Sequence, residues 1–61
     1  MVKRRDLVRD LEKAGFISVG GTNHEMFIKG NTKTVVPRHR EIPNRLAAAI
    51  FKQAGISPRR F

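Results

Sequence analysis

Two histidines are the side chains of this chain best suited to proton transfer, because an unperturbed histidine titrates near neutral pH. His24 follows the glycine-rich run Gly-Gly-Thr-Asn at residues 20–23 and opens a segment with the pattern of a strand. Such a position is rigid on one side and accessible on the other, which a general base requires. The alternative interpretation is an ordinary surface or partly buried histidine.

His39 follows the run Val-Val-Pro-Arg at residues 35–38, which ends another expected strand. In a hairpin the end of one strand lies near the beginning of its partner, so both histidines are predicted at the same edge of the sheet. Two histidines can divide RNA cleavage, one taking the proton of the 2′-hydroxyl and the other protonating the leaving 5′-oxygen. The alternative is that His39 is an exposed loop residue that contacts phosphate at most.

Basic side chains gather around the same segments. Four of them are candidates for binding phosphate and for stabilising the charge of a pentacovalent transition state: Lys29, Lys33, Arg38 and Arg40. Solvated strand and loop charges are the alternative. A second basic group near the N-terminus is interpreted as a general electrostatic surface: Lys3, Arg4, Arg5 and Arg9.

The charge balance points to an anionic partner. The 61 residues include 13 Lys and Arg but only 5 Asp and Glu, which gives a formal net charge of +8. A surplus of this size on a small body creates a positive potential over most of its surface. Nucleic acid, anionic lipid and an acidic protein are all compatible with it, as is a basic surface that only aids solubility, but a pI of this kind is typical of nucleic-acid binders.

Hydrophobic periodicity and turn residues predict five elements. They are a helix over residues 3–14, strands over 16–19, 24–29 and 33–36, and a helix over 43–54. Gly15 and Gly55 are expected to stop the two helices, and Pro37 closes the last strand. The remaining segment, 38–42, is interpreted as a polar connection. The sequence does not decide which face of the strand over residues 24–29 is buried, because Met26 and Ile28 lie on one side and Phe27 on the other.

This order predicts a small α+β domain in which two helices cover one face of a three-stranded antiparallel sheet and leave the other face free. One domain is expected over residues 1–61, with a frayed tail at 57–61. The chain has no cysteine, and its histidines and carboxylates form no recognised ligand pattern, so neither a metal nor a cofactor is expected. The charged N-terminus and the lack of a long apolar run predict a cytoplasmic protein that does not bind membranes.

Four segments resemble the motifs of one known family, in the same order. They are Ala-Gly-Phe at residues 14–16, Gly-Thr-Asn-His at 21–24, Val-Val-Pro-Arg-His at 35–39 and Ile-Phe-Lys-Gln-Ala-Gly-Ile at 50–56. The family is the HicA-type mRNA interferase toxins of prokaryotic toxin–antitoxin systems, and the resemblance extends from Lys3 to Ile56. Each motif alone is weak, but four in the right order at this length are fairly specific.

The resemblance implies a fold similar to a double-stranded-RNA-binding domain and cleavage of mRNA without a metal. It implies that His24 is the catalytic histidine and that a HicB-like antitoxin is the partner. Many members carry a second histidine where this chain has Asn23, so the departure concentrates the catalytic role on His24. A non-catalytic RNA-binding module and a chain that acts mainly through a protein partner are the alternative functions.

Overall fold

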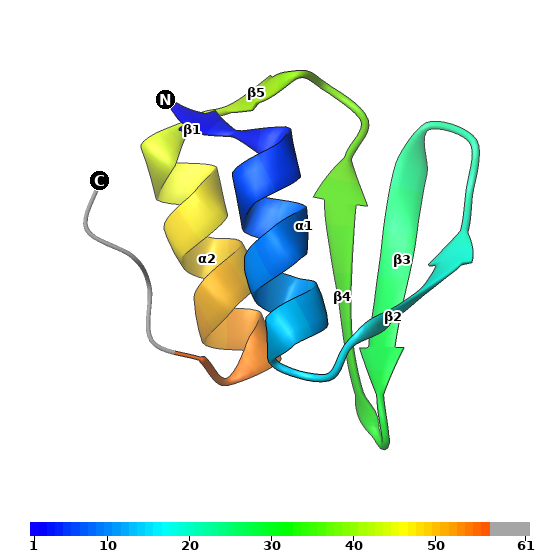
Figure 1. Cartoon of the computed structure of the whole chain (residues 1–61). Helices are drawn as coiled ribbons and strands as arrows, with labels where there is room; N and C mark the ends of the chain where they lie inside the picture. The colour runs from blue at the N-terminus through cyan, green and yellow to red at the C-terminus, as the bar shows by residue number, and fades with distance from the viewer. Residues whose placement is uncertain (57–61) are drawn as a thin grey trace.

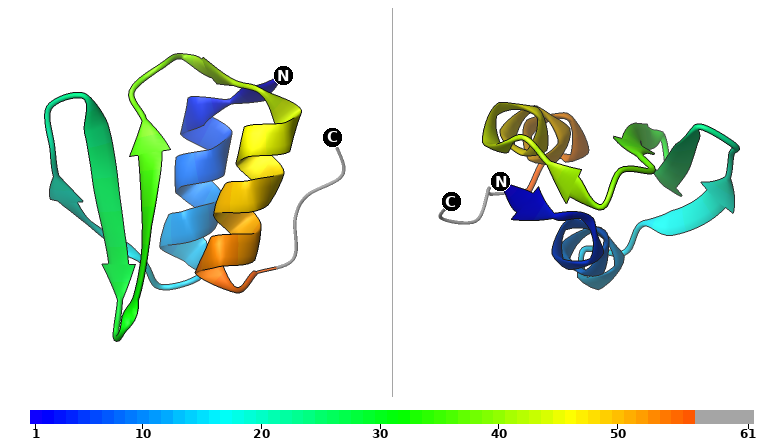
Figure 2. Two further views of the ribbon diagram at one scale, coloured as in Figure 1. Left: turned by 180° about the vertical axis from the view of Figure 1, so that it is seen from behind. Right: turned by 90° about the horizontal axis from the view of Figure 1, so that it is seen from above.

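The computed structural model describes residues 1–56 of the chain. The elements are β1 (Val2–Lys3), α1 (Arg4–Lys13), β2 (Ile17–Gly20), β3 (His24–Lys29), β4 (Thr32–Pro37), β5 (Glu41–Ile42) and α2 (Asn44–Ala54). The two helices lie next to each other on one side of a three-stranded antiparallel sheet (Figures 1 and 2). The predicted α+β fold is therefore confirmed. The predicted frayed tail, residues 57–61, lies outside the described residues.

Helix α1 forms because its apolar residues recur at helical spacing, and Leu7 and Leu11 are fully buried. The N–H of Gly15 donates to the carbonyl of Glu12 at 3.0 Å, and the N–H of Phe16 donates to that of Leu11 at 3.0 Å. This pair of bonds is a Schellman motif, which needs a left-handed residue that glycine supplies at little cost. The predicted stop at Gly15 is thus confirmed.

Helix α2 ends in the same way at Gly55 and packs against the sheet through one face. Its buried residues are Ala47, Ile50, Phe51 and Ala54. In the sequence Leu46 falls at helical spacing with these residues and is therefore expected on the same buried stripe. That expectation is wrong, since 39% of Leu46 is exposed. Leu46 lies instead at the rim of the helix, where it lines an open cleft with Val35.

The main sheet has the strand order β2-β3-β4. The ladder between β3 and β4 is regular from the pair His24–Pro37 to the pair Lys29–Thr32. A two-residue turn joins these strands, and its first residue, Gly30, has a φ of 57°, as the tight turns of hairpins require. The ladder between β2 and β3 shifts register between Ser18 and Gly20.

A second, two-stranded sheet pairs β1 with β5. The prediction of a connection over residues 38–42 is therefore wrong for Glu41 and Ile42. The physical reason is burial, because Ile42 and its partner Val2 are 0% and 8% exposed and belong to the core. Two-residue strands are too short to give a periodic signal in the sequence.

The two faces of the main sheet differ in exposure. Phe27, Thr34 and Val36 are fully buried beneath the helices, which settles the face that the sequence left open. On the other face Met26 and Val35 form a cross-strand pair and are 36% and 39% exposed. The open face of the sheet is therefore apolar along much of its length.

Candidate functional site

His24 is the first residue of β3 and is exposed. It forms the last pair of the β3–β4 ladder with Pro37. Because side chains alternate along a strand, His24 lies on the same open face as Met26 and Ile28. The predicted placement of this histidine, rigid in backbone and accessible in side chain, is what the structure has.

The turn before His24 depends on Gly21. A Cβ atom at this position would lie 2.0 Å from the carbonyl oxygen of His24, and Gly21 has a φ of 131°. A side chain is therefore excluded by contact and by backbone conformation together. The close approach fixes the path of the chain as it enters β3.

Arg38 holds the same turn from the other strand. Its Nε donates to the carbonyl oxygen of Gly21 at 2.8 Å, and its backbone N–H donates to that of Asn23 at 3.3 Å. The side chain is still 42% exposed. Arg38 thus positions the backbone beside His24 while part of its guanidinium faces solvent.

Glu25 is the centre of an ionic network on the opposite face of the sheet from His24. Its carboxylate accepts hydrogen bonds from Arg4 and from the hydroxyl of Ser18, and Arg38 Nη1 lies 3.9 Å away. The hydrogen bonds from Ser18 and Arg4, with the charges of both arginines, hold the pKa of Glu25 below its usual value of 4.5. The carboxylate therefore stays ionised and ties three elements together.

Arg4 connects the start of α1 to this end of the sheet. Its Nε donates to the carbonyl oxygen of Pro37 at 2.9 Å, and its backbone N–H donates to that of Arg40 at 2.9 Å. With its ion pair to Glu25, Arg4 contacts the strand of His24 and the strand opposite. The residues that position His24 thus come from α1, β3, β4 and the segment after β4.

The structure divides the predicted phosphate-binding residues between two ends of the molecule. Arg38 and Arg40 follow β4 directly and lie at the His24 end. Lys29 and Lys33 flank the Gly30 turn, at the other end of the ladder. Five residue steps along β3 correspond to about 17 Å, so these lysines do not share a site with His24.

His39 lies at the His24 end as well. It is exposed and stands two positions after Pro37, the ladder partner of His24. The predicted proximity of the two histidines along the sheet edge therefore agrees with the register. A catalytic role for His39 stays a prediction.

Sequence reasoning missed the roles of Arg4, Glu25 and Ser18. Arg4 was assigned to a general basic surface, yet it forms an ion pair and a hydrogen bond inside the site. Glu25 carried a signal that could have found it, since it is the only carboxylate between residues 13 and 40 of this basic chain. An ionised carboxylate in such surroundings attracts cations from whichever elements the fold brings near it.

The described residues give no indication of a metal site or a membrane span. Among residues 1–56 no three His, Asp or Glu side chains gather as ligands would. Neither of the two helices in that range is long and apolar enough to cross a membrane.

Fold and site together define a small, basic α+β domain with an exposed histidine at one end of its sheet. The model of a family described as the HicA toxin of bacterial toxin-antitoxin matches residues 4–56. This protein therefore belongs to the HicA toxin family, as the sequence motifs indicated. The family is generally one of RNase-type toxins, and a toxin–antitoxin system implies an antitoxin partner. No curated protein and no solved structure matched the chain.

Proposed function

We propose that this protein is a metal-independent endoribonuclease that cleaves mRNA in the cytoplasm, with His24 as its catalytic residue. The observation that carries the proposal is the placement of His24, exposed on the open face and fixed by the Gly21 turn and Arg38. Membership in a family of RNase-type toxins supports the same activity.

The chemistry that suits this site is transesterification within the RNA. His24 takes the proton of a 2′-hydroxyl, and the 2′-oxygen attacks the adjacent phosphorus. The bond from phosphorus to the 5′-oxygen breaks, a 2′,3′-cyclic phosphate forms, and the leaving 5′-oxygen receives a proton. His39 is the candidate donor of that proton, so one proton is taken up by His24 and one is given by His39.

Arg38 and Arg40 are the cations proposed to bind the phosphate near His24. The transition state carries additional negative charge on its phosphoryl oxygens, and a preorganised guanidinium stabilises such charge. Arg38 is preorganised by its bond to Gly21 and remains 42% exposed. Lys29 and Lys33 lie too far along the hairpin for this role and would contact only more distant parts of the RNA.

The test is cleavage of a long mRNA by the wild-type protein and by His24→Ala in the presence of EDTA. We expect the wild type to cut and the variant to lose at least about 10²-fold in rate. Equal rates in the two proteins would refute the role of His24. RNA binding without any cleavage by the wild type would favour a non-catalytic binding module instead.

We also propose that the partner is a HicB-like antitoxin that covers the open face of the sheet. Apolar residues are exposed on or beside this face, and Ile17 and Val19 are 62% and 53% exposed. Exposed apolar patches mark sites of protein association, and a protein seated there would cover His24.

Two experiments test the antitoxin proposal. If expression of this protein arrests growth of the host, co-expression with the antitoxin should relieve the arrest. Ile17→Asp should weaken capture of the toxin by a tagged antitoxin. Undiminished capture would place the interface elsewhere.

A further inference from the structure

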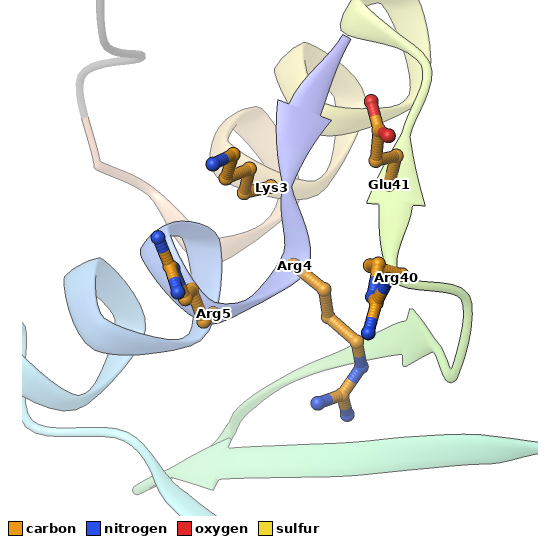
Figure 3. A pocket seen from close by; sticks show the side chains of 5 residues that line it. All are labelled: Lys3, Arg4, Arg5, Arg40 and Glu41. Atoms are coloured by element: carbon orange, nitrogen blue, oxygen red, sulfur yellow. The ribbon is translucent and has the colours of Figure 1, made fainter.

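An open cleft of about 590 Å³ lies where β1 and the start of α1 meet β5. Its lining consists of Lys3, Arg4, Arg5, Arg40 and Glu41 (Figure 3). Four cations therefore face one carboxylate. Among the described residues Lys3, Arg5 and Arg40 take part in no ion pair, whereas Arg4 is paired with Glu25. With Arg4 paired to Glu25, the other three cations exceed the one carboxylate of the cleft, Glu41, by two charges.

These charges are placed against the preference of the helix. Lys3 is the N-cap of α1, and Arg5 lies in its first turn. The helix dipole puts partial positive charge at this end, so cations there are unfavourable for stability. Lys3 lies opposite Glu41 in the β1–β5 ladder, which offsets part of this cost. An anionic ligand would relieve the repulsion that remains among the cations.

The arrangement of the cations suits a chain of negative charges better than a single ion. In Figure 3 Arg4 and Arg40 extend toward the hairpin, while Lys3 and Arg5 extend from the other side of β1. The positive charge is thus divided between the two sides of β1 instead of converging on one point. A polynucleotide backbone, which carries one charge per phosphate, matches a spread of this kind.

The cleft adjoins the end of the sheet that carries the candidate site. Arg4 lines the cleft and donates to the carbonyl oxygen of Pro37, the ladder partner of His24. Arg40 lines the cleft and lies two positions after Arg38, which holds the turn before His24. An RNA strand with one phosphate at His24, on the open face, would therefore reach the cleft by passing around this end of the β3–β4 ladder.

We infer that this cleft is a second phosphate-binding subsite, at which Lys3, Arg5 and Arg40 bind the RNA backbone next to the cleaved bond. The inference rests on the proposed function and adds to it the direction in which the substrate strand leaves the catalytic histidine. The basic group at the N-terminus is then part of the substrate site and not only a general electrostatic surface.

The test measures the binding of a short unstructured RNA by the full chain in a His24→Ala background, so that the RNA stays intact. One variant carries Lys3→Gln with Arg5→Gln. The matched control carries Lys13→Gln with Lys52→Gln, which removes the same charge at the C-terminal ends of the helices. A third variant carries Arg40→Gln alone. The bond between Arg40 and the start of α1 uses the backbone carbonyl, so this substitution leaves it in place. Thermal unfolding is followed for each protein.

We expect the Lys3/Arg5 variant to bind on the order of tenfold more weakly than the control. The slope of log K against log salt concentration should become shallower by about 1.4, because two phosphate contacts at about 0.7 each are lost. Its melting temperature should be unchanged or higher, because cations leave the N-terminus of α1. In the active background KM should rise while kcat stays the same. Arg40→Gln should weaken binding with about half the salt effect. Its kcat should fall as well, because Arg40 is also proposed to stabilise the transition-state charge near His24.

Binding and salt dependence equal to those of the control would overturn the subsite, while cleavage by the wild type would leave the proposed function standing. Loss of antitoxin capture with intact RNA binding would also overturn it and assign the cleft to the protein partner. A wild type that neither binds nor cuts RNA would overturn the proposed function and this inference together.

Discussion

The two ends of the β3–β4 hairpin carry similar charges but differ in how those charges are held. At the His24 end Arg4 and Arg38 form ion pairs and hydrogen bonds with Glu25 and with backbone carbonyls. At the turn end Lys29 donates to the carbonyl oxygen of Ala14 at 2.6 Å, and Lys33 is exposed. Arginine dominates the first end and lysine the second.

The difference teaches that the geometry of a cationic side chain, and not its charge alone, decides what it can hold in place. A planar guanidinium has several donors in fixed directions, so one arginine can bind a carboxylate and a carbonyl group together. A lysine ammonium on a flexible stem does this less well. The arginine end is therefore the one at which a histidine can be positioned for chemistry.

The largest expected effect concerns His39, which lies at the His24 end. If His39 protonates the leaving oxygen, His39→Ala should lower the single-turnover cleavage rate by about 10²-fold. Lys52→Ala, at the opposite end of the molecule, should leave the rate unchanged. Rates of the His39 variant close to wild type would assign proton donation to water and leave His24 as the single catalytic histidine.

A comparison of two glycines tests how rigid the two ends are. Gly21→Ala would bring a Cβ to 2.0 Å from a backbone oxygen, whereas a Cβ at Gly30 meets nothing within 4 Å. We expect Gly21→Ala to destabilise the fold by about 3 kcal/mol or more and Gly30→Ala by about 1 kcal/mol. Urea unfolding measures both, and equal losses would mean that the approach at Gly21 relaxes freely.

Glu25→Gln tests the ionic network. The variant should lose about 1–2 kcal/mol of folding stability, since two arginines lose their charged partner in a partly buried environment. Because folding lowers the pKa of Glu25, its contribution is complete above the usual value of 4.5 and is lost as the pH falls through the folded-state pKa. The stability difference between wild type and variant should therefore shrink in acid. A difference that stays constant down to low pH would exclude the carboxylate charge as its cause.

The smallest expected effect is at the turn end. Lys29→Met removes the bond to the carbonyl of Ala14 but keeps the aliphatic stem, which packs beside Gly15. We expect a loss of at most about 0.5–1 kcal/mol and an unchanged kcat for cleavage. A large fall in kcat would show that the two ends of the hairpin are coupled.

The sequence was enough to predict the helices, the hairpin and the exposure of His24, because these depend on local signals. Leu7 and Leu11 recur at helical spacing, and glycines mark the stops at residues 15 and 55. Such patterns act over a few residues, so they can be recognised without knowledge of the tertiary structure.

The network around Glu25 could not be predicted in this way. Its partners Arg4, Ser18 and Arg38 lie 21, 7 and 13 positions away along the chain, counting from residue 25. Their meeting depends on how α1 packs against the sheet, and no local pattern records that packing. The exposure of Leu46 was missed for a related reason, since it depends on the width of the face that α2 buries.

The pairing of β1 with β5 also has a consequence for the order in which the molecule can fold. Val2 pairs with Ile42, a separation of 40 residues, so this contact can form only after residue 42 has been synthesised. The same delay applies to Arg4, because its side chain and its backbone N–H form hydrogen bonds with residues 25, 37 and 40. A nascent chain shorter than this therefore lacks both the cleft and the contacts of Arg4 at the His24 end of the sheet.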